Sequence, residues 1–168
     1  MSATTLVVND LTAGTTLTNS TAETVLKSHT FPADWFQLGV GHGFTATVRV
    51  PSTNSTDTLT LRARLGGTTL TGTVIAVTAA IDVADDDTAV ISGSFTFDTI
   101  GTAGAGEASS STVGPDAAGI ATGSGQSTAL ASLDTTAALL LEITGEWSVA
   151  SASNQCAAQK LQISILPG

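Results

Sequence analysis

The clearest pattern in the chain is an alternation of apolar and polar residues within residues 57–70. Its apolar positions are Leu59, Leu61, Ala63 and Leu65, and its polar positions are Thr58, Thr60, Arg62 and Arg64. A period of two is typical of a strand with one buried side and one side in water. Gly66 and Gly67 follow, and residues 68–70 resume an extended pattern, which predicts a hairpin closed by a glycine turn. We therefore expect a fold built from antiparallel strands.

The same alternation recurs along the chain. It predicts further strands at residues 21–30, 44–50, 73–79, 89–100, 138–149 and 157–166. With weaker segments, the chain has about eight to ten short strands, with turns at intervals of roughly 8–12 residues and no convincing helix. This pattern predicts an all-β protein, an antiparallel β-sandwich of jelly-roll or related type.

Two segments have a less regular pattern. Residues 1–20 are rich in Thr, Ser, Gly and Asn, and their short apolar run is Leu6-Val7-Val8. We interpret them as an extended N-terminal arm whose strand pairs with its own domain or with a neighbouring subunit, and residues 21–168 as the sandwich domain. Residues 101–126 contain many Gly, Ala and Ser. They form either two weak strands around a turn at Gly114-Pro115-Asp116 or a mobile loop.

The composition narrows the range of partners. A chain of 168 residues is long enough for one domain with a sizeable core. With 14 Asp and Glu against 5 Lys and Arg, the net charge is −9, which disfavours free nucleic acid because phosphate binding needs clustered cations. Cys156 is the one cysteine and is expected to be a buried, inert thiol. We recognise no signal peptide and no apolar run of membrane-spanning length, so we expect a protein that acts in solution.

Three of the five basic residues, Arg49, Arg62 and Arg64, are predicted on the outward sides of two consecutive strands. The short loop between those strands is expected to place them side by side, as a positive patch on an acidic protein. Two interpretations remain open. The arginines pair with nearby acids such as Asp57 or Glu142, or they bind an acidic surface on a partner, a role that suits the bidentate guanidinium group.

Two groups of residues resemble metal ligands. The acidic group is Asp82, Asp85, Asp86 and Asp87, which has the side chains that Ca²⁺ prefers but not the spacing of a Ca²⁺ loop. We therefore prefer a solvated turn. His29 and His42 have no Cys at ligand spacing, so we expect neither a metal nor a cofactor.

The chain also lacks the local motifs of common enzymes. We recognise no Gly-x-Ser-x-Gly motif and no phosphate-binding loop, and we do not expect an enzyme. Trp35 and Trp147 could together form a stacking platform for a sugar. Because Trp147 shares a strand side with Leu141 and Ile143, packing in the core is the preferred interpretation.

Several runs resemble jelly-roll modules in structural proteins of tailed bacteriophages. They are Asp-Thr-Leu-Thr-Leu-Arg-Ala-Arg-Leu-Gly-Gly-Thr-Thr-Leu at residues 57–70, the segment 134–154 with Leu-Glu-Ile-Thr-Gly-Glu-Trp at residues 141–147, and Leu-Gln-Ile at residues 161–163. The similar part covers roughly residues 21–166. Such modules occur as capsid decoration (cement) proteins, head fibres and tail-fibre domains.

The resemblance implies a viral structural protein without enzymatic activity. The expected function is that of a homotrimeric decoration subunit, made in the cytoplasm of a bacterial host, that binds the major capsid protein on the exterior of the virion. Its expected partner-binding residues are Arg49, Arg62, Arg64, Leu6, Val7 and Val8. The alternative is a receptor- or carbohydrate-binding module of a tail fibre or head fibre. Neither function involves nucleic acid or a membrane.

Overall fold

The computed structural model describes residues 5–54, 56–116, 119–122 and 126–166, with the side chains of all of these except 113–122. Its strands are β1 (Thr5–Asp10), β2 (Thr16–Thr18), β3 (Thr24–Phe31), β4 (His42–Ser52), β5 (Thr58–Gly66), β6 (Thr73–Val77), β7 (Ile81–Asp82), β8 (Asp87–Thr99), β9 (Gly104–Asp116), β10 (Gly119–Thr122), β11 (Gln126–Leu133), β12 (Leu139–Trp147) and β13 (Gln155–Ile165). None of the described residues belongs to a helix long and apolar enough to cross a membrane.

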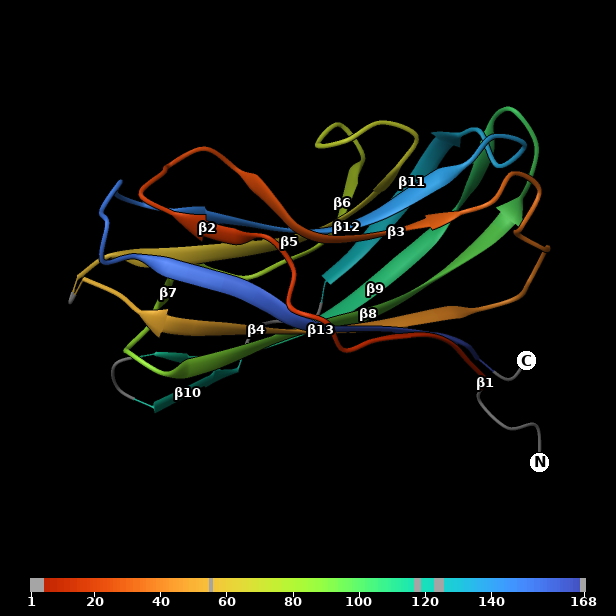
Figure 1. Ribbon diagram of the computed structural model, residues 1–168. Coiled ribbons are helices and arrows are strands. Elements are labelled where there is room, and N and C mark those ends of the chain that lie inside the picture. The colour runs from red at the N-terminus through yellow and green to blue at the C-terminus, as the bar shows by residue number, and fades with distance from the viewer. Residues whose placement is uncertain (1–4, 55, 117–118, 123–125, 167–168) are drawn as a thin grey trace.

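These strands form two sheets that pack face to face (Figure 1). The larger sheet has the order β1-β13-β4-β8-β9-β10, with β2 also paired to β13 and β11 to β9. The smaller sheet has the order β3-β12-β5-β6, with β7 also paired to β5. All of these pairs are antiparallel. The prediction of an all-β antiparallel sandwich is confirmed, and the jelly-roll connectivity stays a prediction.

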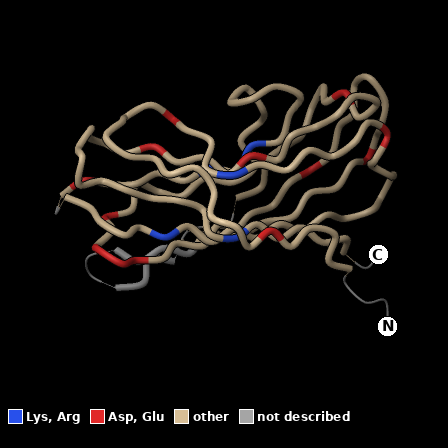
Figure 2. Tube along the Cα trace, viewed as in Figure 1, with Lys and Arg blue, Asp and Glu red and all other residues tan. Residues whose placement is uncertain are grey.

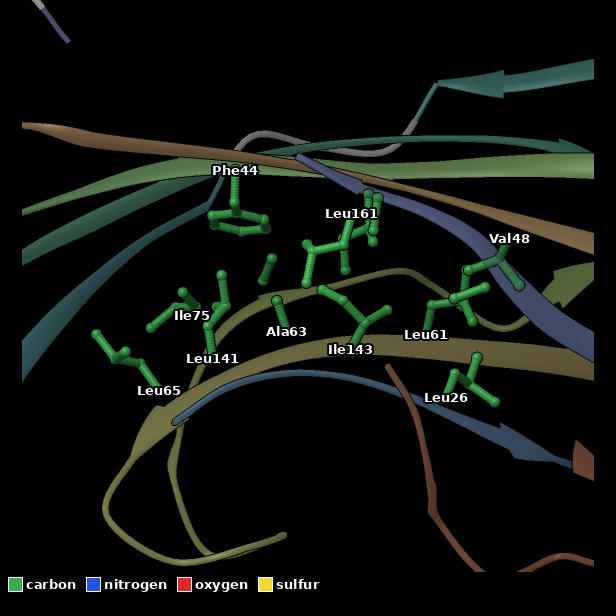
Figure 3. Close-up of a cluster of buried hydrophobic side chains, with 14 of the residues drawn as sticks. Leu26, Phe44, Val48, Leu61, Ala63, Leu65, Ile75, Leu141, Ile143 and Leu161 are labelled. Carbon is green, nitrogen blue, oxygen red and sulfur yellow. The ribbon is translucent and has the colours of Figure 1, made fainter. Parts of the chain in front are cut away.

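The core lies between the two sheets (Figure 3). The predicted apolar side of β5 faces it, because Leu59, Leu61, Ala63 and Leu65 have no exposed surface. Leu141 and Ile143 of β12 lie beside them, and Phe44 and Leu161 reach in from the larger sheet. The alternation in the sequence thus identified the buried positions correctly, because a strand turns successive side chains to opposite faces.

The predicted hairpin after β5 differs in detail. Gly66 still belongs to β5, and β6 begins only at Thr73, so residues 68–70 lie in the connecting loop and are not extended. Leu70 has a left-handed backbone with a φ of 61°. Its backbone N–H donates to Oε2 of the buried Glu142 at 2.8 Å. The carboxylate therefore holds the loop in a conformation that leucine seldom adopts.

In the ambiguous segment 101–126 the structure has β9, β10 and the first residue of β11. β9 pairs with β8 over residues 105–113 and with β11 and β10 on its other edge. It runs through Gly114-Pro115-Asp116, where the sequence suggested a turn, and Pro115 pairs with Ile120 of β10. Residues 117–118 and 123–125 lie outside the described residues. Gly106 permits the close approach of β8, because a Cβ there would stand 1.9 Å from the carbonyl oxygen of Thr96.

The N-terminal residues join the larger sheet. β1 and β2 both pair with β13 of the same chain. Leu17 of β2 is buried in the core, and the backbone N–H of Gly14 donates to the carbonyl of Ala158 at 2.7 Å. The apolar run thus pairs with its own domain, while a separable arm over residues 1–20 stays a prediction.

Candidate functional site

The three arginines of the predicted patch do not lie side by side. Arg49 is on β4 in the larger sheet, whereas Arg62 and Arg64 are on β5 in the smaller sheet. Basic residues are accordingly found in both layers of the sandwich (Figure 2). The expectation of a single patch is wrong because the loop between β4 and β5 crosses from one sheet to the other and does not close a hairpin.

Buried polar groups hold this crossing loop in place. The side chain of Asn154 is buried, and its Nδ2 donates to Oδ2 of Asp57 at 2.9 Å. Its Oδ1 accepts the backbone N–H of Asn54 at 2.8 Å. Asp57, one of the two acids suggested as a partner for the arginines, therefore binds Asn154 and helps to fix this loop. The other, Glu142, binds the backbone of Leu70.

Arg64 and Arg62 instead bind Glu23, which precedes β3. Nε and Nη2 of Arg64 donate to the two carboxylate oxygens of Glu23 at 2.7 and 2.8 Å, and Nη1 donates to the carbonyl of Gly72 at 3.0 Å. Nη1 of Arg62 lies 2.7 Å from Oε2 of Glu146 and 3.7 Å from Oε2 of Glu23. The guanidinium groups of Arg62 and Arg64 are thus both paired with carboxylates of their own chain.

The electrostatics of this pair follow from its geometry. The hydrogen bonds from Arg64 lower the pKa of Glu23, despite the opposing effect of partial burial, and Oγ1 of Thr144 adds a further hydrogen bond at 2.5 Å. In return, Glu23 raises the pKa of Arg64. The Glu23–Arg64 pair is held on the outward side of the smaller sheet, where it stabilises the charged forms of both groups. Its arrangement favours pairing within the chain, and a role in partner binding stays a prediction.

Arg49 has a different environment. Its Nη2 lies 2.5 Å from Oδ1 of Asp86, and both side chains are mostly exposed, at 54% and 72%. Asp86 sits in a turn with a φ of 66°. Of its neighbours, Asp85 accepts the backbone N–H of Thr53, and Asp87 accepts that of Ala84.

The carboxylates of Asp85, Asp86 and Asp87 thus each bind a different partner. No group of three or more His, Cys, Asp or Glu side chains that could hold a metal ion occurs in the part of the chain that the structure describes. Hydrogen bonds that Asp85 and Asp87 accept from nearby backbone groups are typical of a turn, and the preference for a solvated turn over a Ca²⁺ site stays a prediction.

The three residues of the apolar run in β1, at positions 6–8, lie in different environments. Leu6 is half exposed, and Val8 packs against the core. Val7 falls at a register shift, since Leu6 pairs with Ser164 and Val8 pairs with the preceding Ile163. Irregularities of this kind are common at sheet edges, where they bend and twist the strand locally. Of the three residues, Leu6 is therefore the best placed to meet a partner.

The two tryptophans have unequal roles. Trp147 is buried, which confirms core packing for this residue. Trp35 is 36% exposed beside Phe31, and Phe31 pairs with Leu139 at the opposite end of β12 from Trp147. The two rings therefore cannot make a joint platform.

Neither histidine belongs to a group of three or more possible metal ligands among the described residues. His29 is partly buried, with its ring 5.0 Å from that of Phe31. His42 is buried among Phe31, Phe36 and Phe95. Desolvation lowers the pKa of both histidines, despite an opposing backbone contact of His42 with Val40, and so favours their neutral forms.

Sequence reasoning missed two features. The first is Glu23, which lies just outside a strand and binds an arginine 41 residues away. The second is the role of the loop at residues 32–41, whose pocket is described below. The isolated Trp-Phe pair at residues 35–36 was the signal in the sequence for this loop. Comparison with protein-family models, with curated proteins and with solved structures found no match.

Proposed function

We propose that this protein is a non-enzymatic structural subunit, a capsid decoration protein of a tailed bacteriophage that binds the outer surface of the head. The strand order supports the resemblance on which this proposal rests. In the larger sheet β1 and β4 flank β13, and in the smaller sheet β3 and β5 flank β12. The last strands thus lie between early ones in both layers, which is the arrangement expected of a jelly roll wound from Greek keys.

The proposed attachment surface is the edge of β1 that pairs with no other described strand. One edge of β1 pairs with β13, and β1 ends the strand order on that side of the larger sheet. An extended segment of the major capsid protein could add to the other edge through backbone hydrogen bonds, with Leu6 as the exposed apolar side chain at the contact. Arg49 is the most exposed of the three arginines, but it pairs with Ala157 of β13 whereas Leu6 pairs with Ser164, so a partner contact of Arg49 would be separate from this edge.

The proposed assembly is a homotrimer. Three copies of one weak contact bind a repeating shell far more tightly than one copy, because the second and third contacts form at a high effective concentration. A single strand edge with one exposed leucine is a small contact, so multivalency is what makes it sufficient. Light scattering of the purified chain measures the oligomeric state directly, and a stable dimer would contradict the trimer.

The attachment is tested with undecorated heads of the phage that encodes the chain. We expect the wild-type protein to sediment with the heads at saturable occupancy, and Leu6→Asp to lose most of this binding. The matched control is Leu11→Asp, which places the same charge at another exposed leucine just beyond β1. Equal loss in both variants, or in neither, would show that the edge of β1 is not the attachment surface.

A further inference from the structure

The loop between β3 and β4 forms a pocket of about 510 Å³ at one end of the sandwich. Its apolar wall consists of Ala33, Trp35, Val40 and Ile165, and its polar wall of Asp34, Gln37 and His42. Small-molecule sites are typically about 300–1,000 Å³ in volume and combine an apolar lining with a few polar groups. In size and lining, this pocket has the properties of a ligand site.

The pocket is held by hydrogen bonds to two other parts of the chain. The backbone N–H of Asp34 donates to the carbonyl of Thr135 at 3.0 Å, and that of Gly39 donates to the carbonyl of Phe97 at 3.1 Å. Asp34 and Gly39 both have a left-handed backbone, with φ values of 56° and 72°. The loop therefore keeps its shape without a ligand, which reduces the entropy lost on binding.

His42 lines the pocket and carries a buried polar atom. It is only 2% exposed, and its Nδ1 makes no well-formed hydrogen bond among the described residues, although a backbone contact with Val40 opposes the lowering of its pKa. Its ring stacks on Phe95 at 5.4 Å and meets the edge of Phe36 at 5.2 Å, so its orientation is fixed. Buried polar atoms nearly always have a partner, and one without is a candidate for contact with a ligand or water.

We propose that this pocket binds a neutral sugar ring at the end of a glycan. The exposed indole of Trp35 offers a flat apolar surface for the C–H face of a pyranose. Asp34 accepts hydrogen bonds from hydroxyl groups, and the amide of Gln37 both donates and accepts. His42 forms a buried part of the wall, and a hydroxyl would meet its Nδ1 only after a small shift of the ring or the loop. This inference is independent of the proposed role on a capsid.

The same residues disfavour charged ligands. An anionic sugar would meet the carboxylate of Asp34 on a chain of net charge −9. A quaternary ammonium ion is recognised by several aromatic faces, but among the described residues that line the pocket Trp35 is the one aromatic ring besides the imidazole of His42. A cation also makes no use of the donors on Gln37 and His42, whereas a sugar uses donors and acceptors together.

The experiment titrates the ¹⁵N-labelled full chain with glucose, galactose, mannose and N-acetylglucosamine. Its two tryptophans give two indole N–H signals, and the signal of the buried Trp147 is the internal reference. We expect at least one sugar to shift the Trp35 signal saturably, with a dissociation constant near the millimolar range that is usual for a small ligand with few contacts. In Gln37→Ala, whose side chain is exposed, we expect about tenfold weaker binding, as for the loss of one good hydrogen bond in the site.

Further variants and one other ligand locate the site. Trp35→Ala, followed through the backbone amides of the loop, should abolish binding, and His42→Phe should weaken it while keeping the ring. Leu38→Ala is the control, because Leu38 is exposed on the same loop but does not line the pocket. No saturable shift with any of the four sugars, or full binding by Trp35→Ala, would overturn the proposal. Binding of tetramethylammonium in place of all four sugars would overturn the ligand class.

Discussion

The ammonium group of Lys27 lies 3.0 Å from the carboxylate of Asp10 and joins the two sheets. Lys27 belongs to β3 in the smaller sheet, and its side chain is only 4% exposed. Asp10 ends β1 in the larger sheet. Nζ of Lys27 also donates to the backbone carbonyl of Thr12. The N-terminal strand is therefore fastened to the sheet opposite its own.

Replacing Asp10 with Asn should loosen this connection. Hydrogen bonds from Thr12 and the contact with Lys27 lower the pKa of Asp10 from 3.8 to about 2. A carboxyl with a lowered folded-state pKa stabilises the fold above its ordinary pKa and loses this effect as the pH falls through the folded value. Asp10→Asn should thus be less stable than wild type at pH 7, and the difference should vanish between about pH 4 and pH 2.

Hydrogen exchange measures this effect where it occurs. The amides of β1 should exchange faster in Asp10→Asn at pH 7, while those of β5 keep their protection. Asp98→Asn is the control, since it removes the same charge from an exposed position on β8. Unchanged exchange in β1 would mean that the ion pair does not hold the strand.

The two classes of arginine should differ in their effect on stability. Arg64→Gln loses both hydrogen bonds to Glu23 in a partly buried site, so we expect the free energy of unfolding to fall by about 1–3 kcal/mol. Arg49→Gln removes an exposed pair and should change it by no more than about 0.5 kcal/mol. Urea denaturation measures the free energy of unfolding of both variants. Equal losses in the two variants would contradict this prediction.

A double-mutant cycle isolates the Glu23–Arg64 contact. We expect Glu23→Gln and Arg64→Gln to show a coupling free energy of about 1–2 kcal/mol at pH 7. Because the pKa of Glu23 is lowered, the coupling should be present above the ordinary pKa of a glutamate and should disappear as the pH falls through the folded value. A coupling that does not change with pH would not be ionic.

How far the sequence predicts this structure depends on the range of the interaction. The period of two on β5 is local, and it identified Leu59, Leu61, Ala63 and Leu65 as buried. The choice of neighbouring strand is not local, and for this reason the sequence suggested one patch for arginines that belong to different sheets. Glu23 and Arg64 are 41 residues apart, and no spacing rule connects them. The pocket likewise depends on contacts from Thr135 and Phe97 to the loop at residues 32–41.

Gly106 should tolerate no side chain. A Cβ at this position would meet the carbonyl oxygen of Thr96 at 1.9 Å and Cα of Phe97 at 2.8 Å, so β8 and β9 would have to separate. We expect Gly106→Ala to lower the free energy of unfolding by about 1–3 kcal/mol or more. Gly67→Ala is the control, because its nearest neighbour would be the carbonyl oxygen of Ala138 at 4.0 Å. Similar unfolding midpoints in the two variants would contradict the close approach.

Two truncations separate the contributions of β1 and β2. Deletion of residues 1–11 removes an edge strand and should leave a folded domain. Deletion of residues 1–20 also removes the buried Leu17, whose loss alone should cost about 2–5 kcal/mol. Circular dichroism and thermal melting compare the two. If both truncated chains melt at the same temperature, Leu17 contributes little to the core.

The thiol of Cys156 should react slowly in the folded protein. It is buried, and desolvation raises its pKa to about 12, so almost none of it is thiolate at pH 8. We expect a thiol reagent such as DTNB to label it within seconds in denaturant and only on the timescale of opening without denaturant. Rapid labelling of the native protein would show that β13 opens frequently.

The central place of β13 also determines when the larger sheet can assemble during synthesis. β1, β2 and β4 all pair with β13, yet they leave the ribosome long before it. Their shared partner arrives only after more than 100 further residues, so β1 and β2 wait unpaired and β4 keeps one open edge. Pairing between segments so distant in sequence slows folding and leaves edges exposed to other chains. We therefore expect a chaperone, or slow growth at low temperature, to raise the yield of folded protein.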